Sequence, residues 1–154
     1  MDDKLKKTLS RLQAQCVRRE YCVRDIKAKA LKATEGDEAA AQELVDSLLE
    51  DRFVDDARYA AAFAREKSSI AGWGPVKISY ALAAKGIDRQ VIAAALEERD
   101  ESVSSARMES VIAAKYRTLK DDPQAKLKLL RFALSRGYNY DQVKDYVNGI
   151  TEKK

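Results

Sequence analysis

The sequence predicts an all-α protein built from tandem three-helix repeats, with about nine helices in three units that form an elongated, curved array. Apolar residues recur at helical spacing, and no segment shows the alternating β-branched pattern that a sheet requires. Three glycines, Gly36, Gly86 and Gly137, lie 50 and 51 residues apart, and each ends the middle helix of a predicted unit. We therefore predict three units, which span residues 1–52, 53–101 and 102–154.

The first unit begins with a helix from about Lys4 to Val17. One narrow apolar stripe follows this helix, formed by Leu5, Leu9, Leu12 and Cys16. Its other faces are strongly basic and carry Lys4, Lys6, Lys7 and Arg11. A second helix around Ile26 ends at Glu35-Gly36 and turns Arg24, Lys27, Lys29 and Lys32 outward. The third, from about Asp37 to Asp51, presents Leu44, Val45, Leu48 and Leu49 to the core.

The central unit has the clearest start and stop signals. Asp55 is a natural N-cap, because its carboxylate can accept the free amides of a first helical turn, and Asp88 has the same role for the last helix. Pro75 suits the first position of the middle helix, since its missing amide costs nothing there. The helix after Asp55 carries Tyr59, Phe63 and Ile70 at helical spacing, and the aromatic pair is expected to pack inward. Trp73, between Gly72 and Gly74, is expected to cover the end of its own bundle rather than to serve as an exposed anchor.

The third unit is expected to contain a helix from about Ser102 to Leu119, with Ser102 as its N-cap. The next helix ends at Arg136-Gly137, and its inward stripe is predicted to be Leu127, Leu130 and Leu134. A last helix begins at about Tyr140 and buries Val143, Tyr146, Val147 and Ile150.

The composition argues against most classes of enzyme. Among the 154 residues there is no histidine, so neither the commonest general base nor the commonest metal ligand is available. The two cysteines, Cys16 and Cys22, lack the spacing of a zinc or thioredoxin-type motif, and Cys16 is expected to be a buried structural thiol. This composition therefore predicts no metal site. No apolar run suits a membrane span or a signal peptide, so we expect a cytoplasmic protein.

Charge is unevenly distributed along the chain. Residues 1–34 carry a net charge of +6, residues 35–100 carry −6, and residues 101–154 carry +4. Basic ends around an acidic middle favour a partner that bears both signs of charge, although helix faces that are simply solvated would give a similar distribution. In the last unit, Lys128 and Arg131 are neighbours on one helix and could form a stripe for phosphate or for an acidic surface.

Three segments of the central unit carry a resemblance to the RecX family. They are Phe53-Val54-Asp55-Asp56-Ala57-Arg58-Tyr59-Ala60, then Gly72-Trp73-Gly74-Pro75-Val76-Lys77-Ile78, and then Leu82-Ala83-Ala84-Lys85-Gly86-Ile87. The earlier Arg18-Arg19-Glu20-Tyr21-Cys22 resembles the opening motif of that family. The resemblance departs at Lys77, where arginine is more usual.

The resemblance implies a regulator of the bacterial recombinase RecA. Proteins of this family lie along the groove of the RecA filament on single-stranded DNA and typically suppress its ATPase, strand-exchange and coprotease activities. The resemblance also implies that the protein has no catalytic residue and no cofactor. We accordingly expect a monomer that binds the RecA filament, together with single-stranded DNA in or near it. The candidate contacts are Arg18, Arg19, Arg58, Arg65, Lys77, Lys85, Lys126, Lys128 and Arg131.

Two other functions stay open at this point, a helical DNA-binding protein and a general scaffold for protein partners. A recognition helix needs Arg, Asn or Gln along one face. The last helix of the central unit instead carries Glu97 and Glu98 after Arg89 and Gln90, so specific DNA reading by that helix is not expected.

Overall fold

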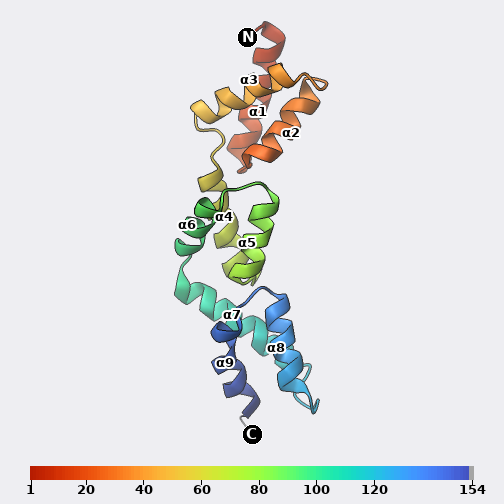
Figure 1. Ribbon diagram of the computed structural model, residues 1–154, viewed down its shortest axis with the longest axis vertical. Coiled ribbons are helices and arrows are strands. Elements are labelled where there is room, and N and C mark those ends of the chain that lie inside the picture. Colours follow the sequence, from red (N-terminus) through yellow and green to blue (C-terminus); the bar gives the residue numbers. More distant parts are fainter. Residues whose placement is uncertain (153–154) are drawn as a thin grey trace.

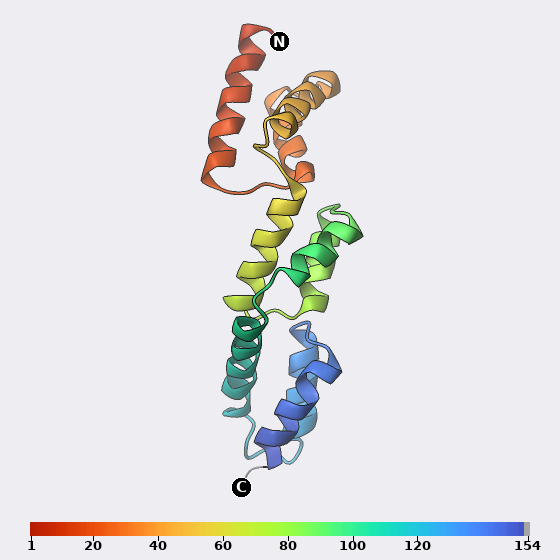
Figure 2. The same cartoon turned by 90° about the vertical axis from the view of Figure 1, so that its left-hand side faces the viewer.

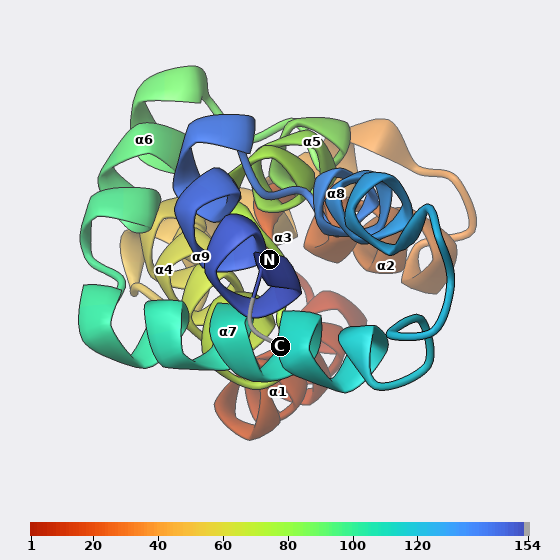
Figure 3. The same cartoon turned by 90° about the horizontal axis from the view of Figure 1, so that it is seen from below.

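The computed structural model describes residues 1–152, and over this range it consists of nine α-helices with no strand. The helices are α1 (Asp3–Arg18), α2 (Val23–Ala33), α3 (Glu38–Glu50), α4 (Asp56–Ser69), α5 (Pro75–Ala84), α6 (Arg89–Glu97), α7 (Glu101–Tyr116), α8 (Ala125–Ser135) and α9 (Tyr140–Glu152). They form a long column with the two ends of the chain at opposite tips (Figures 1 and 2). Viewed along the column from its C-terminal end, the helices lie around one common axis (Figure 3). The predicted all-α, tandem arrangement is confirmed.

Aspartates begin most of the helices, because a carboxylate can accept the free amides of the first turn. Asp55 accepts the amide of Arg58 at 3.1 Å, and Pro75 is the first residue of α5, both as predicted. The prediction that Ser102 caps the seventh helix is wrong. Asp100 is the N-cap and accepts the amide of Val103 at 3.1 Å, while the Ser102 hydroxyl donates to the same carboxylate. A charged carboxylate suits the positive end of a helix better than a hydroxyl does.

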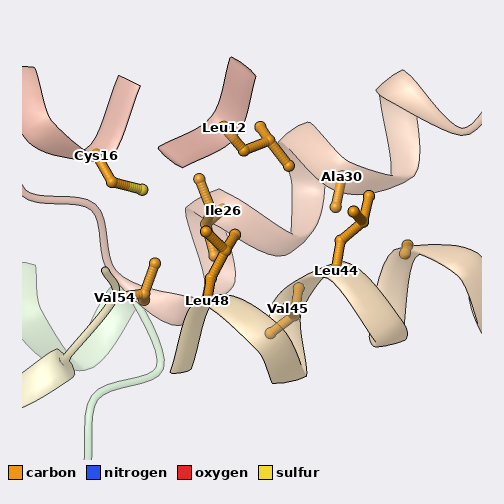
Figure 4. Close-up of a cluster of buried hydrophobic side chains, with 9 residues drawn as sticks. Leu12, Cys16, Ile26, Ala30, Leu44, Val45, Leu48 and Val54 are labelled. Carbon is orange, nitrogen blue, oxygen red and sulfur yellow. The ribbon is translucent and has the colours of Figure 1, made fainter. Parts of the chain in front are cut away.

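Three groups of helices each enclose a cluster of buried side chains, and we call them the first (α1–α3), second (α4–α6) and third (α7–α9) units. In the first, Leu12, Ile26, Leu44 and Leu48 converge from three helices (Figure 4). The second cluster is built from Tyr59, Ile78, Leu82 and Ile92 with their neighbours, and the third from Met108, Ile112, Leu129, Val143 and Val147 with theirs. Cys16 is buried as predicted, whereas Leu49 is 39% exposed.

Two residues pack outside the unit from which they come in sequence. Cys22, from the segment between α1 and α2, is fully buried in the second cluster. Val54, from the segment between α3 and α4, is buried in the first cluster. The predicted division at residue 52 is therefore crossed by packing in both directions, and the division at residue 101 falls at the first residue of α7.

The inward face of α8 differs in part from the prediction: of the three predicted leucines, only Leu130 packs against the third cluster, where it is partly buried. Leu127 is 45% exposed and Leu134 is 47% exposed, and the buried residues of the helix are Ala125, Leu129 and Ala133. Both sets follow helical spacing, because α8 has apolar residues on two sides. The core takes the set with two alanines, and small side chains let neighbouring helices approach closely. After α4, Ile70 continues the helical spacing of Tyr59 and Phe63, but it is the C-cap and is 69% exposed.

The second and third units meet where the turn between α8 and α9 sits on the first turn of α5. The amide of Gly74 donates to the carbonyl of Arg136 at 2.8 Å, and the amide of Val76 donates to that of Gly137 at 3.0 Å. The buried hydroxyl of Tyr138 donates to the carbonyl of Gly72 at 2.7 Å. The bonds from Gly74 and Val76 give partners to helix-start amides that have none within their own helix.

This junction requires glycine at both contact points. A Cβ on Gly74 would lie 2.3 Å from the carbonyl of Gly137, and a Cβ on Gly137 would lie 2.4 Å from the Cβ of Lys77. Gly137 also has a φ of +91°, in the left-handed region that favours glycine. The two backbones are therefore in direct contact.

We expect Gly74→Ala to lower the free energy of unfolding by about 1–3 kcal/mol, because the new methyl group cannot enter without separating the two backbones. The matched control is Gly149→Ala in α9, where an added Cβ meets nothing within 4 Å. It is expected to be neutral or to stabilise by up to about 1 kcal/mol. Urea unfolding monitored by circular dichroism measures both, and equal effects of the two substitutions would contradict the glycine contact.

Candidate partner-binding surface

The nine candidate cations do not form one patch but lie in three places along the column. Four of them, Arg18, Arg19, Arg58 and Lys85, lie near the junction of the first and second units. Arg65 and Lys77 belong to α4 and α5 of the second unit, and Lys126, Lys128 and Arg131 belong to α8 of the third. Figure 1 shows α8 far from α1. Any partner that contacts all three places must therefore extend along the column.

Arg58 links the first two units. Its Nε atom lies 2.6 Å from Oε2 of Glu20, and its Nη2 donates to the carbonyls of Arg52 and Phe53 at 3.1 and 3.2 Å. The hydrogen bond with Glu20 raises the pKa of Arg58 above its ordinary value. The guanidinium thus connects the start of α4 to the segment between α1 and α2 and to the segment that follows α3. Arg58 therefore has a structural role whether or not it also touches a partner.

Lys85 pairs with Asp25 across the same junction. Its Nζ lies 2.9 Å from Oδ2 of Asp25, and Arg24 beside it donates to the carbonyl of Ala84 at 2.6 Å. The amide of Val23, the first residue of α2, donates to the carboxylate of Asp56 at 2.8 Å. As at the other junction, the turn after the middle helix of one unit meets the start of the middle helix of the unit before it. Here, however, charged side chains make most of the polar contacts.

Lys77 and Lys67 flank Trp73. Their Nζ atoms lie 4.3 and 4.9 Å from the ring centroid of the indole, within the range of cation–π attraction. The indole also meets the Phe63 ring edge-on at 6.1 Å, and Phe63 stacks on Tyr59 at 6.0 Å. The prediction that Trp73 packs against its own bundle is confirmed. Lys77 is partly engaged with that bundle as well.

The remaining candidates are more accessible. Arg18, Arg65, Lys126 and Arg131 are exposed, and no ion pair within residues 1–152 involves them. Arg19 is exposed too, with its guanidinium carbon 4.7 Å from the centroid of the Tyr21 ring. Lys128 bonds to the carboxylate of Asp122, just before α8. The exposed group is therefore the better set of partner contacts.

Sequence reasoning missed two kinds of residue. It did not identify the carboxylates that neutralise the candidate cations, because Glu20 and Asp25 are 38 and 60 residues away from their partners in the chain. It also treated Arg11, Lys29 and Lys32 as outward basic faces, whereas these three side chains line one cleft between α1 and α2. Helical spacing alone could have placed Lys29 and Lys32 side by side, but not opposite Arg11.

The chemistry available along the column is that of binding. Burial raises the pKa of both thiols, Cys16 and Cys22, which keeps them protonated and weakly nucleophilic. Within the described part of the chain, no three Cys, Asp or Glu side chains gather as metal ligands would. No helix among residues 1–152 has both the length and the apolar character to cross a membrane.

The pair between Asp25 and Lys85 predicts a specific response to acid. Burial raises the pKa of Asp25, but hydrogen bonds from Lys85 and Cys22 outweigh it and hold the pKa below its usual range. The pKa of an aspartate in an unfolded chain is about 3.9. The stability that this group contributes is therefore fully present above that pH and is lost as the pH falls through the lower pKa of the folded state. We expect Asp25→Asn to cost about 0.5–1 kcal/mol at neutral pH and nothing in strong acid. Urea unfolding at both pH values tests this, with the exposed Asp121→Asn as control; an Asp25→Asn cost that persists unchanged in acid would contradict it.

Comparison with known proteins identifies the family. A model described as "RecX, second three-helix domain" matches residues 55–96, and one described as "RecX, third three-helix domain" matches residues 106–147. Regulatory protein RecX of Clostridium botulinum (strain Alaska E43 / Type E3) is 34% identical over 115 residues, which cover 72% of this chain and 53% of the relative. That of Pseudomonas entomophila is 32% identical over 106 residues, covering 68% of this chain and 67% of the relative. The chain thus spans about half the length of the first of these relatives.

Two solved structures share the fold. The crystal structure of RecX from Lactobacillus salivarius superposes with a TM-score of 0.83 at 18% identity, covering 97% of this chain and 98% of that one. A crystal structure of regulatory protein RecX gives a TM-score of 0.83 at 22% identity, covering 95% of this chain and 72% of that one. The matched family models, the sequence relatives and the shared architecture lead to one conclusion: the chain belongs to the RecX family.

Proposed function

We propose that this protein binds the RecA filament on single-stranded DNA and regulates it, mainly by inhibiting its ATPase, strand-exchange and coprotease activities. The observation that carries the proposal is membership of the RecX family, whose relatives are named regulatory protein RecX. In this proposal the protein acts in the cytoplasm as a monomer and uses no catalytic residue.

The shape of the molecule supports a filament as the partner. Exposed cations lie on the first, second and third units, from the junction of the first two units down to α8. A filament repeats the same surface at regular intervals, so a column of similar units can contact several protomers at once. The acidic middle of the chain and its basic ends suit a partner whose surface carries both signs of charge.

The candidate residues divide into two roles under this proposal. Arg18, Arg19, Arg65, Lys126 and Arg131 contact the filament or its DNA, because their side chains are exposed and form no ion pair within the described residues. Arg58, Lys77, Lys85 and Lys128 bear on binding mainly by holding parts of the column together, since each is already engaged within the protein.

Sequence-specific DNA reading by α6 has less support. The exposed residues at the C-terminal end of that helix are Ala93, Ala94 and Glu97, followed by the C-cap Glu98, so this end would repel phosphate. A general protein scaffold would share the whole architecture and differ only in the identity of its partner.

The ATPase of RecA from the same organism on single-stranded DNA tests the proposal. We expect suppression at ratios well below one chain per RecA protomer, because a bound chain would affect more of the filament than the protomers it touches. No change in ATPase at equal ratios would refute the proposed function and leave the fold unaffected.

Charge reversal separates contact residues from the rest of the surface. We expect the triple variant Arg65→Glu, Lys126→Glu, Arg131→Glu to need at least about tenfold more protein for half-maximal suppression, because it removes three exposed cations from two units. The control variant Lys6→Glu, Arg117→Glu, Lys120→Glu changes the net charge equally at other exposed positions. Circular dichroism melting checks that both are folded. Equal loss in both variants would show that only total charge matters and would remove the assignment.

A further inference from the structure

A cleft of about 330 Å³ opens between α1 and α2 of the first unit. Figure 2 shows α1 along one side of this unit. From α1 the cleft receives Thr8, Arg11 and Gln15, and from α2 it receives Lys29 and Lys32. Three of these five side chains are cationic, and no carboxylate lines the cleft. None of its cations is among the candidate contacts that the sequence suggested.

Helix geometry directs these cations to one place. Lys29 and Lys32 are three residues apart and therefore share a face of α2, although like charges at this spacing repel each other. Thr8 and Arg11 have the same relation on α1, and Nη2 of Arg11 donates to Oγ1 of the buried Thr8 at 3.2 Å. That bond fixes the position of the guanidinium at the wall of the cleft. The fold therefore holds three positive charges around a single hollow.

Most of the carboxylates on the segment that forms the cleft, residues 1–34, are engaged elsewhere. Residues 1–34 contain four of them, Asp2, Asp3, Glu20 and Asp25. Asp2 caps α1 through the amide of Leu5 at 2.7 Å, Glu20 pairs with Arg58, and Asp25 pairs with Lys85. Asp3 lies exposed in the first turn of α1 and forms no ion pair within the described residues. The contacts between the first two units thus pair two of these four carboxylates with cations of the second unit, and none of the four lines the cleft.

The surroundings of the cleft favour a nucleic acid over an acidic protein. Beside it, Tyr21 lies under two cations, with Lys29 Nζ at 5.3 Å and Arg19 Cζ at 4.7 Å from the ring centroid. Arg19 also borders a groove of about 420 Å³ that holds the aromatic rings of Tyr59 and Phe63, together with two carboxylates, Glu20 and Glu66. An aromatic ring beside cations, as Tyr21 lies beside Lys29 and Arg19, is typical of surfaces that bind single-stranded nucleic acid, where cations meet phosphates and rings meet bases.

We propose that the cleft formed by Arg11, Lys29 and Lys32 binds phosphate groups in the backbone of single-stranded nucleic acid. Arginine offers a planar fork of donors and lysine a mobile point charge, and phosphate accepts from both. The inference deepens the proposed function, because it assigns a DNA contact to the first unit. Its test contains no RecA, so failure here and failure of the proposed function can be told apart.

The test is the affinity for a fluorescent oligothymidylate of about 20 nucleotides, measured by anisotropy over a series of salt concentrations. We compare the full chain with the triple variant Arg11→Gln, Lys29→Gln, Lys32→Gln and with the control variant Lys6→Gln, Arg117→Gln, Lys120→Gln. Both variants lose three positive charges, but the control positions are exposed and lie outside the cleft. Circular dichroism melting checks the fold of each.

The expected result is a loss of at least about tenfold in affinity for the cleft variant at low salt, with the control within about threefold of the unchanged chain. The slope of log affinity against log salt should fall by about 2 in magnitude, since each contact with a single strand contributes about 0.7. Equal losses in the two variants would overturn the assignment to the cleft. Competition by polyglutamate as effective as competition by unlabelled oligothymidylate would overturn the choice of phosphate.

Discussion

The assembly of the column depends on which groups accept hydrogen bonds from the backbone amides at the start of each middle helix. The first amides of a helix have no partner within it, and burying them unpaired is costly. At α2 the amide of Val23 bonds to Asp56 of the second unit, and at α5 the amides of Gly74 and Val76 bond to carbonyls of the third. At α8 no further unit follows in the described chain, and Asp122 accepts the amide of Gln124 at 2.8 Å instead. The second and third units therefore each supply acceptors for the middle helix of the unit before them, and the third unit supplies an acceptor for its own middle helix.

The two junctions meet this requirement by different means, and the difference affects the surface. The junction of the second and third units uses backbone carbonyls and a close glycine contact, which involve no carboxylate. The junction of the first and second units uses Glu20 and Asp25. Two of the four carboxylates of residues 1–34 are therefore paired with cations of the second unit. The positive character of the α1–α2 cleft follows in part from the way the first unit is attached. The ion pairs that attach the first unit to the second thus also affect the charge on the surface of the first unit.

Local signals made much of the fold predictable, and long-range pairing accounts for the rest. Asp55, Pro75 and the glycine spacing act within a few residues, so the sequence alone sufficed to place the helices around them. The inward face of α8 could not be read in this way, because two faces were apolar and only the neighbouring helices select Leu129 over Leu127. Of the candidate site, the sequence indicated which cations are present but not that Arg58 and Lys85 already have partners.

Some candidate cations already bond to other groups within the protein, so a loss of partner binding after their substitution has two explanations. Arg58 bonds to a carboxylate and to two carbonyls at one junction, so its removal would alter the relation between the first two units even if no partner touches it. Glu20 provides the means to separate the two effects, because it belongs to the same ion pair but repels any phosphate nearby. A contact role for Arg58 predicts that its loss weakens partner binding more than the loss of Glu20 does. A purely structural role predicts similar weakening from both, since either substitution breaks the same link between the units.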